Sequence, residues 1–142
     1  MKLVDVNVLL NAVNEDSVGH SPARALLEAA LAAPAGVGFA WIVVLGFVRL
    51  VTRRGILAHP MPVEDALGIV DDWLTAPQAR LVEPTPRHWP TLARLLVGAG
   101  AAGNLTTDAH LAALAIEHGA TLVSFDRDFE RFAGLDFELL KA

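Results

Sequence analysis

The chain has 142 residues, a length typical of one compact domain that can bury a sizeable apolar core. Charged residues make up 19% of it, and the net charge is −5. This acidic balance excludes a broad basic surface for nucleic acid, so any contact with nucleic acid must be local. The absence of cysteine excludes disulfides, zinc–thiolate sites and thiol nucleophiles.

The sequence predicts neither export nor membrane insertion. Residues 29–48 carry no charge over the length of a membrane span, but Pro34, Gly36 and Gly38 interrupt them. Asp5 lies where the apolar core of a signal peptide would begin, and no cleavage-site pattern follows. We therefore expect a cytoplasmic protein without membrane contact. The small share of charge further predicts an apolar face that is covered in a homodimer or by a partner protein.

In chain order, residues 2–4 form a short apolar run that ends at Asp5, and residues 6–12 have helical spacing. Ser21 before Pro22 predicts the N-cap and first residue of a second helix that ends near residue 31. A strand at residues 37–40 leads into an apolar helix over residues 41–52. The spacing from residue 63 predicts another helix, which stops at Pro77.

The second half of the chain continues the alternation of strands and helices. A short strand is predicted at residues 81–82, and helices at residues 88–99 and 107–118, with Gly119 as the C-terminal cap of the latter. Residues 121–124 read as a buried strand and residues 137–140 as an edge strand. We expect a three-layer α/β/α sandwich around a mostly parallel sheet of four or five strands, in a single domain of residues 1–142.

Three aspartates fall at positions that this topology gathers. Asp5 follows the first strand, Asp108 lies in the first turn of a helix, and Asp126 follows the strand at residues 121–124. Right-handed crossovers bring the carboxyl ends of parallel strands to one edge, where ligands bind. Clustered carboxylates repel unless a cation neutralises them, and oxygen-only donors favour Mg²⁺ or Mn²⁺. Such an ion can activate water for phosphodiester hydrolysis.

Each aspartate also has a purely structural interpretation. Asp5 could be a turn residue at a strand end, and Asp108 could simply complement the dipole of its helix. Asp128 could be the functional acid instead of Asp126, or both could be solvated loop residues. We favour Asp126 because it is nearer to the end of the strand.

The segments around these aspartates resemble the three signature blocks of PIN-domain proteins. They are KLVDVNVLL at residues 2–10, TDAHLAALA at residues 107–115 and SFDRDF at residues 124–129. In order and spacing they are similar, over nearly the whole chain, to the VapC toxins of VapBC toxin–antitoxin pairs. The resemblance implies a PIN-like fold and a Mg²⁺- or Mn²⁺-dependent endoribonuclease. It also implies a protein that is commonly dimeric and is inhibited by a small VapB antitoxin in its active-site groove.

The resemblance assigns roles by motif. Asp5 and Asp108 would be the principal metal ligands, and Asp126 would be a further acid of the site. Asn7 and Ser124 fall where family members often carry small polar residues, which would position side chains or water.

One departure from the family pattern concerns the helix after the second strand. PIN nucleases usually carry an acid there, most often glutamate, whereas residues 43–48 contain none. Gly46 or Phe47 aligns with that place. Water or another acid could fill it, and Glu15, Asp16 and Asp128 are the candidates.

Arginines follow the same apolar helix. The guanidinium groups of Arg49, Arg53 and Arg54 could bind RNA phosphates beside the acidic site. They could equally cap the C-terminal dipole of the helix or pair with surface acids. His110 lies near Asp108, but its neighbours follow an ordinary helical pattern, so we expect a structural or exposed role for it.

Two other functions compete with catalysis of RNA cleavage. A PIN-like domain that has lost turnover would serve as an RNA-binding or partner-binding module. A phosphatase of the haloacid dehalogenase type is less favoured. Its second acid is replaced by Asn7, and no lysine follows until Lys141.

Overall fold

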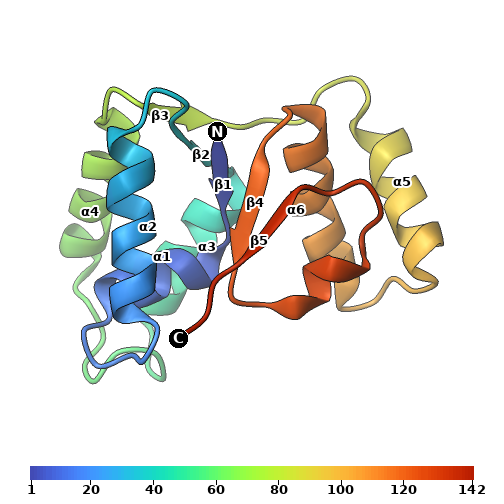
Figure 1. Ribbon diagram of the computed structural model, residues 1–142. Helices are drawn as coiled ribbons and strands as arrows, with labels where there is room; N and C mark the ends of the chain where they lie inside the picture. Colours follow the sequence, from blue (N-terminus) through green and yellow to red (C-terminus); the bar gives the residue numbers. More distant parts are fainter.

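A computed structural model describes residues 1–142 and contains five strands, six α-helices and one 3₁₀ helix (Figure 1). In chain order these are β1 (Lys2–Val4), α1 (Val6–Val13), α2 (His20–Ala32), β2 (Val37–Phe39), α3 (Trp41–Thr52), α4 (Val63–Thr75), β3 (Ala79–Leu81), α5 (His88–Ala99), α6 (Leu105–Glu117), β4 (Thr121–Ser124), η1 (Arg127–Arg131) and β5 (Phe137–Leu139).

The five strands form one parallel sheet in the order β3-β2-β1-β4-β5. β1 lies at the centre, where Leu3 pairs with Gly38 of β2 on one side and with Leu122 of β4 on the other. This confirms the predicted parallel α/β sheet and sets its strand number at five. The edge strand predicted near the C-terminus is β5.

Helices cover both faces of the sheet. The chain advances in one direction from β1 to β2 to β3, and right-handed crossovers then place α1 to α4 on one face. It returns past β1 to β4 and β5, which places α5, α6 and η1 on the opposite face, as Figure 1 shows. The predicted three-layer architecture is therefore confirmed. The direction reverses between β1 and β4, so the carboxyl ends of these two strands form the topological switch point.

Three element boundaries differ from the sequence-based prediction. α2 begins at His20 with Gly19 as N-cap, so the predicted capping role of Ser21 is wrong. Gly19 is already in the helical region, because a turn closed by the hydrogen bond from His20 N to Ser17 O leads the chain into the helix early. β3 begins earlier than predicted, because residues 79–81 pair with β2. α6 starts at Leu105 rather than at residue 107.

A core of 31 buried apolar residues fills the space between the layers. Phe39 and Phe47 pack against Trp73 on the α3 and α4 side, with ring centroids 6.1 and 4.9 Å from it. α6 is buried on most of its surface because it lies between the sheet and α5. No helix of the chain combines the length and apolar composition that crossing a membrane requires.

A network of polar side chains fastens α5 and the preceding loop to the end of α6. The Glu117 side chain, only 1% exposed, accepts hydrogen bonds from the backbone N–H and the hydroxyl of Thr85 and pairs with His88. His88 Nε2 lies 2.8 Å from His110 Nδ1. His110 therefore faces α5, and the structural role expected for it stays a prediction. Burial would raise the pKa of Glu117, but the hydrogen bonds from His88 and Thr85 outweigh it and hold that pKa below 4.5.

Glu117→Ala should lower the free energy of unfolding by about 3 kcal/mol, because it leaves buried donors without an acceptor. The lowered pKa of Glu117 adds a pH dependence that denaturant unfolding can measure. Its contribution is complete above the ordinary pKa of 4.5 and is lost as the pH falls through the folded-state value. Glu130→Gln changes an exposed side chain and serves as the control. Equal stability of Glu117→Ala and the wild type would contradict the network's role.

Candidate metal centre

Asp5 lies directly after β1 and caps the N-terminus of α1. Its Oδ1 accepts a hydrogen bond of 2.7 Å from the backbone N–H of Val6. Its Oδ2 accepts hydrogen bonds from the Ser124 hydroxyl at 2.7 Å and from the Asn7 side-chain amide at 3.1 Å. Because α1 begins immediately after Asp5, β1 and α1 together hold this carboxylate at the carboxyl end of the central strand.

Asn7 and Ser124 join the first turn of α1 to the end of β4. The Asn7 amide donates to Ser124 Oγ at 2.9 Å, and Asn7 Oδ1 accepts from the backbone N–H of Phe125 at 3.2 Å. Ser124 is completely buried, and its Oγ accepts from the backbone N–H of Asp126 at 3.0 Å. The two predicted supporting residues thus lie beside Asp5 and tie the loop after β4 to it.

Asp108 and Asp126 lie near Asp5, the first on α6 and the second in the turn between β4 and η1. Asp108 lies in the first turn of α6, and Asp126, two residues after the end of β4, is the N-cap of η1. Asp128 lies two residues further on, and carboxylate oxygens of Asp108, Asp126 and Asp128 are all within 4.8 Å of one another. The choice between Asp126 and Asp128 that the sequence posed is therefore not exclusive, because both approach Asp108.

Burial and neighbouring carboxylates raise the pKa values of Asp108 and Asp5. Burial, followed by the charges of Asp5, Asp126 and Asp128, raises the pKa of Asp108 from 3.8 to about 6. Burial also raises the pKa of Asp5, and the charge of Asp126 adds to the rise, while hydrogen bonds from Ser124 and Val6 oppose it. The three aspartates predicted from the sequence therefore lie close enough to repel one another.

A small cavity of about 60 Å³ adjoins Asp5 and Asp108. This volume holds about two species the size of water. Its remaining walls are Val6, Thr107 and Leu111, with Ile42 and Val43 of α3. Donors that consist of oxygen suit the hard cations Mg²⁺ and Mn²⁺, whose charge would relieve the repulsion behind the high pKa of Asp108. The residues present therefore fit a divalent cation.

The helix α3 brings no carboxylate to this place. Phe47 is completely buried and packs edge-on against Trp73, so it belongs to the core. Gly46 lies beside Val6, where an added Cβ atom would be 3.4 Å from Val6 Cγ2. Of the two residues that align with the usual acid of the family, Gly46 is the one next to Asp5 and its neighbours.

Glu15 and Asp16 do not take the place of that acid. Both are exposed in the turn after α1, and neither belongs to the carboxylate cluster. Glu15 instead lines a separate cavity with Arg24. Asp128 is thus the one candidate of the three that lies with Asp108.

Arg49 lies in the last turn of α3, and Arg53 and Arg54 follow the end of this helix. Arg49, Arg53 and Arg54 are exposed, and none of them forms an ion pair with an acid. With a rise of 1.5 Å per residue, Arg49 lies about 10 Å along the helix from Ile42. Their guanidinium groups are therefore open to an external anion.

Comparison with known proteins gives the family. The family model described as PIN domain matches residues 2–135. Ribonuclease VapC37 of Mycobacterium tuberculosis is 52% identical over 138 residues, which cover 97% of this chain and 96% of that protein. Ribonuclease VapC43 of the same organism is 42% identical over 135 residues, which cover 95% of this chain and 92% of that protein.

Solved structures share the fold. VapBC2 from Rickettsia felis, bound to a DNA fragment from its promoter, matches with a TM-score of 0.71 at 18% identity, covering 99% of this chain and 98% of that chain. VapC20 of Mycobacterium tuberculosis, a toxin that cleaves the sarcin-ricin loop, matches with a TM-score of 0.69 at 21% identity, covering 95% and 96%. The matching family model and the two close relatives show that the chain belongs to the PIN domain family and, within it, to the VapC proteins.

Proposed function

We propose that this chain is the toxin of a type II toxin–antitoxin pair, an endoribonuclease that hydrolyses RNA phosphodiester bonds with Mg²⁺ or Mn²⁺. The approach of Asp5, Asp108 and Asp126 at the carboxyl ends of β1 and β4 carries the proposal. Its relatives of matching length are named ribonucleases, which supports the reaction class.

The side chains of such a site would have different roles. A bound dication would lower the pKa of a water molecule and stabilise negative charge on the scissile phosphate. Asp5, Asp108 and Asp126 would hold it, and the hydrogen bonds from Ser124 and Asn7 fix the orientation of Asp5. Arg49 and Arg53 are exposed and would bind phosphates of the RNA.

The alternative is a PIN-like module that binds RNA or a partner without turnover. The absence of an acid in α3 favours it, because the site then has one carboxylate fewer than is usual in the family. The carboxylates of Asp108, Asp126 and Asp128 favour catalysis, since they leave several oxygen ligands within reach of one ion.

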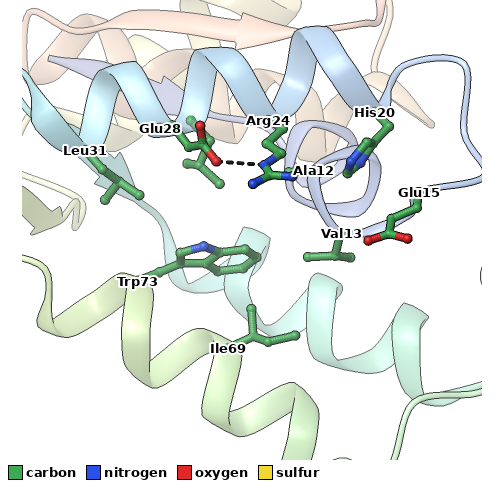
Figure 2. A pocket seen from close by; sticks show the side chains of 10 residues that line it. Ala12, Val13, Glu15, His20, Arg24, Glu28, Leu31, Ile69 and Trp73 are labelled. Atoms are coloured by element: carbon green, nitrogen blue, oxygen red, sulfur yellow. Dashed lines mark hydrogen bonds and ion pairs between the residues drawn. The ribbon is translucent and has the colours of Figure 1, made fainter.

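A VapB-type antitoxin is the partner that we propose. A cavity of about 300 Å³ lies between α1, α2 and α4 and has an apolar floor that includes Leu31, Ile69 and Trp73. Figure 2 shows the last two reaching from α4 towards α2. Glu15 on the rim has no ion pair, whereas Arg24 pairs with Glu28 at 2.7 Å. This surface fits an amphipathic segment that carries apolar residues and one basic side chain.

Self-association of the toxin stays a prediction, and exposed apolar side chains on two helices support it. On α3, Trp41 is 46% and Leu45 is 63% exposed, and on α5 Trp89 is 73% and Val97 is 82% exposed. Apolar surface of this kind is covered in many oligomers. We propose a homodimer or a toxin–antitoxin hetero-oligomer.

Induced expression should arrest growth, and the purified protein should cut RNA with Mg²⁺. Asp5→Asn and Asp108→Asn should lower cleavage by roughly 100-fold or more because each removes a metal-holding charge. Asp72→Asn on the exposed face of α4 is the control and should behave as the wild type. Growth arrest by the two site variants at the wild-type level would show that catalysis is not the cause.

The acids of the site should make the metal-free protein less stable as the pH rises. The pKa of Asp108 is about 6 when folded and 3.8 when unfolded, so stability is lost as the pH rises between these values. Asp108→Asn should remove this loss. Its stability advantage should grow by about 1 kcal/mol from pH 5 to 7.5, less than the full shift gives because solvent screens a half-exposed group.

Denaturant unfolding with and without Mn²⁺ measures this effect. Mn²⁺ should stabilise the wild type and leave Asp108→Asn unchanged. A stability difference between the two proteins that does not vary with pH would refute the explanation by charge repulsion.

Leu31→Asp should weaken binding of the antitoxin about tenfold or more by placing a charge in the apolar floor, while RNA cleavage stays unchanged. The antitoxin to test is the small protein encoded next to this chain's gene, and calorimetry measures its affinity. Leu67→Asp is the matched control, because this exposed leucine of α4 does not line the cavity. Wild-type affinity of Leu31→Asp would place the antitoxin elsewhere.

A further inference from the structure

The side chain of Trp41 belongs to the part of α3 that adjoins the metal centre. Trp41 is the first residue of α3, and the next residue, Ile42, lines the small cavity together with Asp5 and Asp108. The preceding strand β2 pairs with β1, and Asp5 follows the end of β1. The indole ring is therefore carried by the same edge of the sheet as the carboxylates of the site.

A polar contact holds this ring in place although the residue is partly exposed. Trp41 is 46% exposed, and its Nε1–H donates a hydrogen bond of 3.4 Å to Glu83 Oε1. The backbone carbonyl of Glu83 accepts a hydrogen bond of 2.7 Å from His118 Nε2 at the end of α6. The segment after β3 thus connects the ring to α6. A ring that is already held loses little conformational freedom when it binds a ligand.

The charges around Trp41 favour a nucleic-acid base as its ligand over a phosphate. Glu83 is exposed and forms no ion pair, so its carboxylate repels the RNA backbone at this place. A base is uncharged, and every base has a π-face that stacks on an aromatic ring. The exposed Arg49 lies two turns further on, about 12 Å along α3, where it is open to a phosphate of the same strand.

Two other exposed apolar residues differ from Trp41 and provide matched controls. Leu45 lies one turn after Trp41 and is 63% exposed, but it has no ring on which a base could stack. Trp89 is 73% exposed on α5 and does not line the cavity beside Asp5 and Asp108. A protein partner on α3 would cover both Trp41 and Leu45, whereas a base would bind to Trp41 alone.

We propose that Trp41 stacks on one base of the RNA, next to the bond that is cleaved. The proposal rests on the proposed function, in which the site cleaves RNA. It gives the chain a contact with the substrate outside the carboxylates and the arginines. Because a missing or displaced base would lose this contact, Trp41 helps to determine where the chain cuts.

Fluorescence anisotropy with a labelled single-stranded oligoribonucleotide tests the proposal without reference to activity. EDTA prevents metal-dependent cleavage, and low salt preserves the phosphate contacts. Trp41→Ala should weaken binding about tenfold, which is the usual effect of removing one stacking aromatic. Trp41→Phe keeps a ring and should bind within about threefold of the wild type. Leu45→Ala and Trp89→Ala should bind within about twofold, since neither removes a stacked ring. Circular dichroism checks the fold of each variant.

Substrates that lack a single base identify the stacked position. The cut bond fixes the register of the RNA, so cleavage with Mg²⁺ is measured on oligoribonucleotides without one base on either side of that bond. For the wild type, loss of one particular base should lower kcat/KM about tenfold, mainly through a higher KM. For Trp41→Ala, loss of the same base should have no further effect. The proposal is overturned if each missing base affects the two proteins equally, or if Trp41→Ala binds RNA as the wild type does.

Sedimentation velocity tests the competing explanation, in which α3 is covered by a second copy of the chain. If Trp41→Ala and Leu45→Ala both dissociate an oligomer and lose RNA binding to the same extent, Trp41 is an interface residue and the proposal is overturned. Failure of the proposed function has a different result, because the wild type would then cut no RNA with Mg²⁺. Cleavage by the wild type with an unchanged KM for Trp41→Ala would refute the stacking contact alone.

Discussion

Parallel pairing of β1 with β4 is the constraint on which the site depends. The two strands are far apart in the sequence, yet Val4 lies opposite Val123, and Asp5 N donates to Val123 O at 3.0 Å. The next residues, Asp5 and Ser124, are then joined by the hydrogen bond from the serine hydroxyl. A shift of one residue in this register would turn each side chain to the other face of the sheet. The position of the carboxylate is therefore set by backbone pairing in the buried centre of the molecule.

The same pairing brings negative charges together, which opposes folding. Burial and neighbouring acids raise the pKa of Asp108 to about 6, which means that the folded chain holds this group less readily as a carboxylate than the unfolded chain does. The buried apolar core supplies the stability that tolerates this repulsion. Binding of a dication therefore stabilises this site more than it would stabilise a neutral site. The ion removes the repulsion between the carboxylates as well as binding their oxygens.

Much of the fold could be predicted from the sequence because apolar spacing and strand-helix alternation are local signals. The positions of Asp5, Asp108 and Asp126 could be predicted for the same reason, since each of them follows a strand or begins a helix that the local pattern identifies. The role of Glu117 was not, because its partners Thr85 and His88 lie about 30 residues earlier and no local pattern joins them. The start of α2 was mispredicted from Ser21, since the preceding turn and not the capping side chain directs the chain into the helix.

Asp5 serves two purposes, and the choice of substitution decides which of them an experiment reports. It accepts the backbone N–H of Val6 as the cap of α1 and also faces the other carboxylates of the site. Asparagine caps helices as well as aspartate does, whereas alanine removes the cap at a cost of about 1 kcal/mol. Asn at this position therefore removes the charge and keeps α1 in place, and α1 also lines the cavity between α1, α2 and α4 at its far end. A loss of cleavage with unchanged antitoxin binding would then come from the missing charge and not from a displaced helix.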